Sequence, residues 1–201
     1  MLKKTALSIS VLFHPLIMPL AGMAILLFTG SYVSLLPFPA KKMILLLFAI
    51  GTLFLPAIMI PLAYFRNELK MQKQDERTLP LILTFTFYIL TYFLFLKIPV
   101  FGFMHNFMLG ALFAVFLALI INLQWKISLH MIGLGGLTAF LLIIILTKQV
   151  NVYSWLLLSI LASGLAGTAR LYLNSHSPAQ IYTGYFIGCI SMTVCMLLMG
   201  N

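Results

Sequence analysis

Long apolar stretches, separated by short polar segments, run along the whole chain. Seven of them approach or exceed the ~20 residues that cross the hydrocarbon core of a bilayer. They span residues 6–28, 43–65, 79–96, 105–123, 130–147, 152–169 and 179–199, which leaves little sequence for a soluble domain. The pattern predicts an all-α integral membrane protein, a polytopic bundle of about six to seven transmembrane helices that forms one domain over residues 1–201.

Composition supports the same class. Hydrophobic residues make up 63% of the chain and charged residues only 7%, whereas soluble domains carry about 25% charged residues. The formal net charge is +9, but the cations stand singly or in pairs at the ends of apolar stretches, as orientation rules and anionic lipids favour. We therefore expect the lipid bilayer, and no nucleic acid, as a partner.

Two histidines receive a structural interpretation from their local context. His14 precedes Pro15 in the first apolar stretch, where we expect a kink whose freed backbone groups neighbouring helices satisfy. His105 stands at the start of the fourth stretch, where we expect it at the membrane interface. Neither position indicates catalysis by itself.

Residues 66–80 form the most charged segment of the chain. The segment carries four cations together with all the acidic residues, which are Glu68, Asp75 and Glu76. Such mixed-charge runs are usually solvated loops. The alternative is a phosphate-binding limb, because Lys70 offers a point charge and Arg77 a planar fork that suit phosphoryl oxygens. Taken alone, the segment favours the loop.

A second polar cluster opens the fifth apolar stretch. Ser128 precedes His130 by two residues at the start of a predicted helix, where backbone N–H groups and the helix dipole favour an anion. The local pattern leaves a structural and a functional role of His130 balanced. The glycines that follow favour close helix packing; they are Gly133, Gly135 and Gly136.

The third cluster, residues 169–180, places Arg170 and His176 six residues apart between two apolar stretches. Ionisable groups next to hydrocarbon lose hydration that only a partner or a ligand replaces. Tracing the chain across the membrane puts residues 66–80, 124–130 and 169–180 on one face. The three clusters therefore predict one shared site.

Together these clusters resemble the three-part signature of the type 2 phosphatidic acid phosphatase superfamily, K-x6-R-P, P-S-G-H and S-R-x5-H-x3-D. The motifs occupy residues 70–77, 127–130 and 169–180, and the resemblance to a catalytic core covers residues 66–190. Several positions depart from the signature: Thr78 replaces Pro, Ile127 and Leu129 replace Pro and Gly, Ala169 replaces Ser, and Gln180 replaces Asp.

The resemblance implies a lipid-phosphate phosphatase that needs no metal and no cofactor. His176 would attack phosphorus to form a phosphohistidine, and His130 would act as the general acid toward the leaving oxygen. The phosphate oxygens of a membrane lipid phosphomonoester or pyrophosphate would be held by Lys70, Arg77, Ser128 and Arg170. Phosphoryl transfer is mainly positioning plus charge stabilisation, which cations and amides can supply.

Gln180 stands where the superfamily has the Asp that orients the nucleophile. Its amide oxygen can accept a bond from His176 but carries no charge, so we expect orientation to survive and electrostatic assistance to fall. One alternative is that Asp75 or Glu76 packs toward His176 and supplies the missing carboxylate. Another is a catalytically silent relative that binds or transfers a phospholipid.

A small transporter or channel is disfavoured, because the apolar stretches are poor in polar residues and show no internal repeat. The resemblance implies an integral protein of the bacterial inner (cell) membrane. Cations are richer on the face of the motifs, which the positive-inside rule would make cytoplasmic. However, Lys70, Arg77 and Arg170 would be there for phosphate, so the sequence leaves the side of the site open, as it does the oligomeric state.

Overall fold

The computed structural model describes the chain except residues 1, 30–31, 66–76, 149 and 199–201. The described residues form helices and no strand. Within this described part of the chain, six helices are long and apolar enough to cross a membrane, and a bent pair near the N-terminus would make a seventh span. The predicted all-α polytopic membrane bundle is confirmed.

The last five predicted spans correspond to five helices. They are α5 (Thr78–Leu96), α6 (Gly102–Asn122), α7 (Leu129–Lys148), α8 (Tyr153–Tyr172) and α9 (Pro178–Leu198). No boundary differs from the expected one by more than three residues. The positions and lengths of the apolar stretches were therefore sufficient to predict these five helices.

The second predicted span begins earlier than expected. It runs through α3 (Phe38–Ala49), the π-helical turn η2 (Ile50–Phe54) and α4 (Leu55–Phe65), after the short 3-10 helix η1 (Tyr32–Leu35). Proline is tolerated in a first helical turn, and Pro39 stands there. The helix therefore includes Lys41 and Lys42, which we expected before it.

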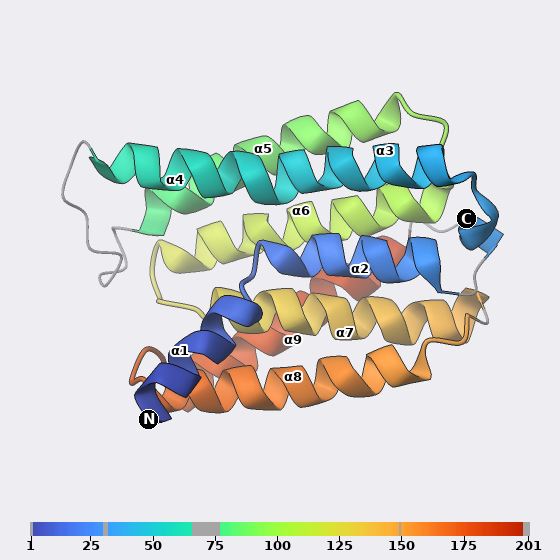
Figure 1. Cartoon of the computed structure of the whole chain (residues 1–201). Helices are drawn as coiled ribbons and strands as arrows, with labels where there is room; N and C mark the ends of the chain where they lie inside the picture. Colours follow the sequence, from blue (N-terminus) through green and yellow to red (C-terminus); the bar gives the residue numbers. More distant parts are fainter. Residues whose placement is uncertain (1, 30–31, 66–76, 149, 199–201) are drawn as a thin grey trace.

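The first predicted span is broken. Its two parts, α1 (Leu2–Leu12) and α2 (Ile17–Phe28), are bent by 59° relative to each other. Pro15 lies in the break, where its missing N–H and its ring interrupt helical bonding. The expected kink is thus a full break: α1 turns aside to pack on α8, while α2 packs on α3 and α7 (Figure 1).

The helices run back and forth, so their ends collect at two ends of the bundle. The starts of α5, α7 and α9 and the ends of α6 and α8 share one end, on the left in Figure 1, and α1 lies there too. For the described residues, the prediction that the three polar clusters share one face is confirmed.

The centre of the bundle is α7, which packs most closely on α9. A Cβ atom at Gly135 would lie 2.1 Å from the carbonyl oxygen of Tyr185, and one at Gly188 would lie 2.0 Å from that of Ile132. Only glycine fits such an approach of two backbones. The prediction that Gly133, Gly135 and Gly136 serve close helix packing is confirmed at Gly135.

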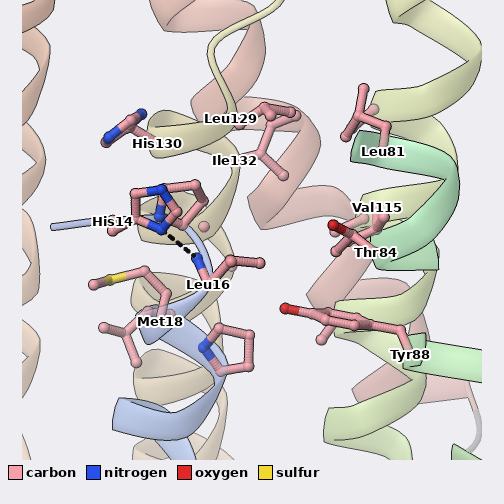
Figure 2. A pocket seen from close by; sticks show the side chains of 18 of the residues that line it. His14, Leu16, Met18, Leu81, Thr84, Tyr88, Val115, Leu129, His130 and Ile132 are labelled. Atoms are coloured by element: carbon pink, nitrogen blue, oxygen red, sulfur yellow. Dashed lines mark hydrogen bonds between the residues drawn. The ribbon is translucent and has the colours of Figure 1, made fainter. Parts of the chain in front are cut away.

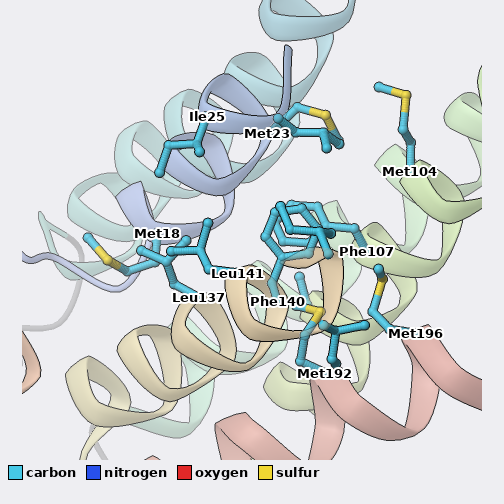
Figure 3. Packing of buried hydrophobic residues seen from close by; sticks show 14 of the residues in the cluster. Met18, Met23, Ile25, Met104, Phe107, Leu137, Phe140, Leu141, Met192 and Met196 are labelled. Atoms are coloured by element: carbon cyan, nitrogen blue, oxygen red, sulfur yellow. The ribbon is translucent and has the colours of Figure 1, made fainter. Parts of the chain in front are cut away.

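The apolar core lies between α2, α6, α7 and α9 and is rich in aromatic rings and methionines (Figure 3). The rings of Phe107 and Phe140 are 4.2 Å apart between centroids. Met23 and Met104 are fully buried beside them, and their flexible thioethers fill irregular gaps. This packing fixes α6, α7 and α9 relative to one another.

Candidate functional site

A cavity of about 360 Å³ lies inside the bundle, within the size range of small-molecule sites. Its wall is formed by residues of α2, α5, α6, α7, α8 and α9 together with adjoining loops. Its charged and imidazole side chains come from the end of the bundle that holds the polar clusters; they are His14, Arg77, His130, Arg170 and His176. The rest of the wall is almost entirely apolar (Figure 2).

Four of the seven predicted site residues line this cavity: Arg77, His130, Arg170 and His176. Ser128 and Gln180 do not line it but lie directly behind it, as their contacts below show. Lys70 lies outside the described residues. The structure thus brings together most of the residues that the three motifs contributed.

His176 lies in the short connection between α8 and α9 and is only 7% exposed. Its Nδ1 is 3.1 Å from Oε1 of Gln180, and the backbone N–H of Ser177 donates to the same oxygen at 3.1 Å. An amide oxygen only accepts, so Nδ1 of His176 carries the hydrogen. The unprotonated nitrogen of the ring is therefore Nε2.

The surroundings keep this imidazole neutral. Burial lowers the pKa of His176 to about 3, with further lowering by the positive charges of Arg77 and Arg170, while the bond to Gln180 opposes the shift. A neutral ring with a free Nε2 lone pair is a nucleophile. Among the described residues, the bond expected between Gln180 and His176 is present.

His130 lies in the first turn of α7 and faces the N-terminal helices. Its Nε2 is 3.0 Å from the backbone carbonyl oxygen of Ser10 in α1. Because a carbonyl only accepts, Nε2 carries the hydrogen and Nδ1 is left with a lone pair. The ring also packs edge to face against His14, with centroids 5.7 Å apart.

Ser128 ties the second and third motifs together. Its backbone N–H donates to the carbonyl oxygen of Gln180 at 3.4 Å. Its side chain is fully buried, yet among the described residues its Oγ has no hydrogen-bond partner, and the same holds for the buried Nε of Arg170. Buried polar atoms normally have partners, so both atoms are polar groups beside the cavity whose hydrogen bonds the described residues do not supply.

Two residues that the motifs did not select belong to this region. His14 lines the cavity, although its sequence context indicated a structural kink. Lys126 lies close enough that Arg77 and Arg170, together with burial as the main cause, lower its pKa. The signal for His14 was its place before Pro15, at what proves to be a helix break. Lys126 gave no signal beyond its charge.

His105 contrasts with the other three histidines. It lies at the opposite end of the bundle, where its Nε2 is 3.0 Å from the carbonyl oxygen of Phe95. The ring packs edge to face on Phe95. These contacts agree with the structural role expected for it.

The electrostatic character of the site follows from its composition. Three cations, Arg77, Lys126 and Arg170, act on His176 within a largely buried volume. The three acidic residues of the chain lie outside the described residues, so the idea that Asp75 or Glu76 supplies a carboxylate stays a prediction. Among the described residues the site is therefore positive, which favours an anionic ligand.

Comparison with protein-family models, curated proteins and solved structures finds no match to this chain.

Proposed function

We propose that the protein is a lipid-phosphate phosphatase that forms a phosphohistidine on His176. The observation that carries the proposal is the cavity, in which two arginines and a neutral, oriented histidine meet an apolar interior. The cationic end suits a phosphomonoester or pyrophosphate, and the apolar part suits the hydrocarbon of a membrane lipid.

The apolar part has few polar groups to offer a ligand, because its hydroxyls are bonded to the protein. Thr84 Oγ donates to the carbonyl oxygen of Pro80 at 2.8 Å, and the hydroxyl of Tyr88 is 3.5 Å from the carbonyl oxygen of Thr52. Both Thr84 and Tyr88 line the cavity. An occupant of this part gains by burying apolar surface, which selects a lipid over a soluble phosphate ester.

The proposed reaction has two displacements. In the first, the bound phosphate monoanion passes its proton to Nδ1 of His130. The Nε2 lone pair of His176 then attacks phosphorus, the bond from phosphorus to the lipid oxygen breaks, and Nδ1 of His130 protonates that oxygen. In the second, water attacks phosphorus of the phosphohistidine, Nδ1 of His130 takes up a proton of the water, the bond from phosphorus to Nε2 of His176 breaks, and inorganic phosphate leaves. Arg77 and Arg170 offset the negative charge spread over the phosphoryl oxygens in both steps.

Each histidine has a neutral orienter. Gln180 holds Nδ1 of His176, and the carbonyl of Ser10 holds Nε2 of His130. A carboxylate behind a catalytic histidine also stabilises the cation that develops on it, and an amide oxygen does so less. We therefore expect turnover that is real but slower than a carboxylate in place of Gln180 would allow.

The neutral Gln180 also favours a second candidate, a protein that binds or transfers a phospholipid without hydrolysing it. Such a protein needs the cations but no nucleophile. Replacing His176 separates the two, because it abolishes the function of a phosphatase and leaves lipid binding nearly intact.

The test is phosphate release by purified protein in detergent, without added metal, across a panel of polyprenyl and glycerol lipid phosphates. His176→Ala should abolish release. His105→Ala is the matched control, because it removes a histidine from the opposite end of the bundle and should leave release unchanged. Tight lipid binding without release by the wild type would support the second candidate and refute the first.

A further inference from the structure

We propose that the break between α1 and α2 is part of the site, and that His14 is a positioning residue that holds the ring of His130. The inference rests on the proposed function for the chemistry of His130, but its structural core is testable without turnover. It gives the N-terminal helices, which lie outside the three motifs, a role in catalysis.

The break creates the acceptor for His130. In an uninterrupted α-helix the carbonyl of Ser10 would accept the N–H of His14. Instead, the N–H of His14 donates to the carbonyl of Val11 at 3.3 Å, as in the tightened last turn of a helix. The carbonyl of Ser10 is thereby left for Nε2 of His130 at 3.0 Å. Since helix C-termini carry partial negative charge, this carbonyl suits an imidazole N–H and an imidazolium still better.

His14 fixes the plane of the His130 ring. The two rings pack edge to face, with 76° between their planes. His14 is itself held from below, because the N–H of Leu16 donates to its Nδ1 at 3.4 Å, as the dashed line in Figure 2 shows. Rotation of the His130 ring, which would take Nε2 away from Ser10, therefore meets the ring of His14.

The arrangement decides which nitrogen of His130 exchanges a proton. Nε2 is committed to the carbonyl of Ser10, so Nδ1 is the nitrogen that takes the proton of the bound phosphate, gives it to the leaving oxygen and later takes one from water. An imidazolium at His130 would face Arg170 from α8, Arg77 before α5 and His14 from the break. Among the described residues, the acceptor for this imidazolium is the carbonyl of Ser10. The position of that carbonyl therefore affects how readily His130 gains and loses its proton.

Two substitutions separate the two contacts of His14. His14→Phe keeps an aromatic ring against His130 but removes the acceptor for the N–H of Leu16. His14→Asn keeps a side-chain acceptor two residues before Leu16, as in an Asx turn, but removes the ring. His105→Ala again serves as the control for loss of a histidine remote from the site.

The readouts are kcat and KM for phosphate release, thermal stability in detergent, and the tautomer of His130 from NMR of protein labelled with 15N-histidine. We expect His14→Asn to lower kcat by about 10-fold to 100-fold with a smaller change in KM, because a misplaced catalytic group slows the chemical step. His14→Phe should recover most of that loss. The Nε2–H form of His130 should dominate in the wild type and in His14→Phe, and a mixture should appear in His14→Asn.

Three results would overturn the inference. They are a kcat of His14→Asn equal to that of the wild type, a His14→Phe variant as impaired as His14→Asn, and a His130 tautomer that no substitution changes. If the wild type releases no phosphate from any lipid, the proposed function fails and the tautomer decides alone. Loss of the Nε2–H form in His14→Asn would then still support the positioning by His14.

Discussion

Gln180→Glu tests the least conventional feature of the proposed chemistry, a nucleophilic histidine oriented by a neutral amide. Glu has the shape of Gln, so a carboxylate oxygen would lie where Oε1 now lies, 3.1 Å from Nδ1 of His176. It would still accept the N–H of Ser177. The substitution therefore adds charge with little change of geometry.

The magnitude follows from that distance. A unit charge pair at 3.1 Å attracts by about 5 kcal/mol at an effective dielectric constant of ~20. Burying the new carboxylate costs several kcal/mol, which the neighbouring Arg77 and Arg170 offset in part. A net stabilisation of about 1–2 kcal/mol of the cation that develops on His176 would raise kcat about 5-fold to 30-fold.

The assay is phosphate release at saturating lipid phosphate, at a pH where the His176 ring of the variant is still neutral. The carboxylate raises the pKa of His176, so kcat is compared at the pH optimum of each protein, where His176 is neutral and His130 can still receive a proton. KM should rise, because a carboxylate next to the site repels the substrate phosphate. Gln180→Ala is the matched control, since it removes the orienter and should lower kcat.

Two outcomes would refute this reasoning. If neither Gln180→Glu nor Gln180→Ala changes kcat, Gln180 does not orient the nucleophile, and Asp75 or Glu76 becomes the candidate for that role. If a folded Gln180→Glu protein has a lower kcat at its pH optimum, no positive charge develops on His176 in the slow step.

Three further predictions follow from the site and the packing around it. Because the pKa of His176 lies at about 3 rather than at the usual 6.5, the acidic limb of kcat/KM should lie well below pH 6. In the unfolded chain the imidazole of His176 takes up a proton below about pH 6.5, whereas in the folded chain it does not, so the folded state should lose stability as the pH falls from 6.5 toward 3. Melting temperatures of the wild type and of His176→Asn over that range test this. Equal pH dependence of the two proteins would contradict it. Arg170→Met should lower phosphate release about 100-fold or more, because a cation that stabilises the phosphoryl oxygens is lost. The melting temperature of the lipid-free protein should not fall, because a half-buried cation whose Nε has no described partner does not stabilise the fold. A strong fall in the melting temperature would mean that Arg170 is structural. Gly188→Ala should destabilise the bundle by about 1–3 kcal/mol in thermal unfolding, because its Cβ would lie 2.0 Å from the carbonyl oxygen of Ile132. Gly164→Ala is the control and should leave stability unchanged, because its Cβ would meet nothing within 4 Å.

The bundle was largely predictable from apolar length, and the errors have specific causes. The span at Phe38 begins early because Pro39 is compatible with a first helical turn, although proline in sequence suggests a loop. The break at Pro15 was expected as a kink. Its extent depends on where α1 finds a surface to pack on, and α8 supplies that surface from more than a hundred residues away.

The candidate site was predictable only where residues stood in recognisable spacing. Arg77, His130, Arg170 and His176 were found by motif and proved to line one cavity. His14 was assigned a structural role, because the contact that links it to His130 spans more than a hundred residues and depends on a helix break. The spacing of residues along the chain predicts contacts within one helix or loop. It does not predict which backbone carbonyl loses its helical hydrogen bond at a break and becomes available to a distant side chain.

The backbone contact between α7 and α9 has a consequence for how this protein can vary. Gly135 and Gly188 place main chain against main chain, and the N–H of Ser128 reaches the carbonyl of Gln180 a short way along the same interface. No layer of side chains lies at these contacts to repack, so the spacing of the segments that carry His130 and His176 is set by peptide geometry. Substitutions at lipid-facing positions, and membranes of different composition, should therefore leave the spacing of the two histidines unchanged. The outer surface of the bundle is free to diversify while the spacing of these two cavity-lining histidines stays the same.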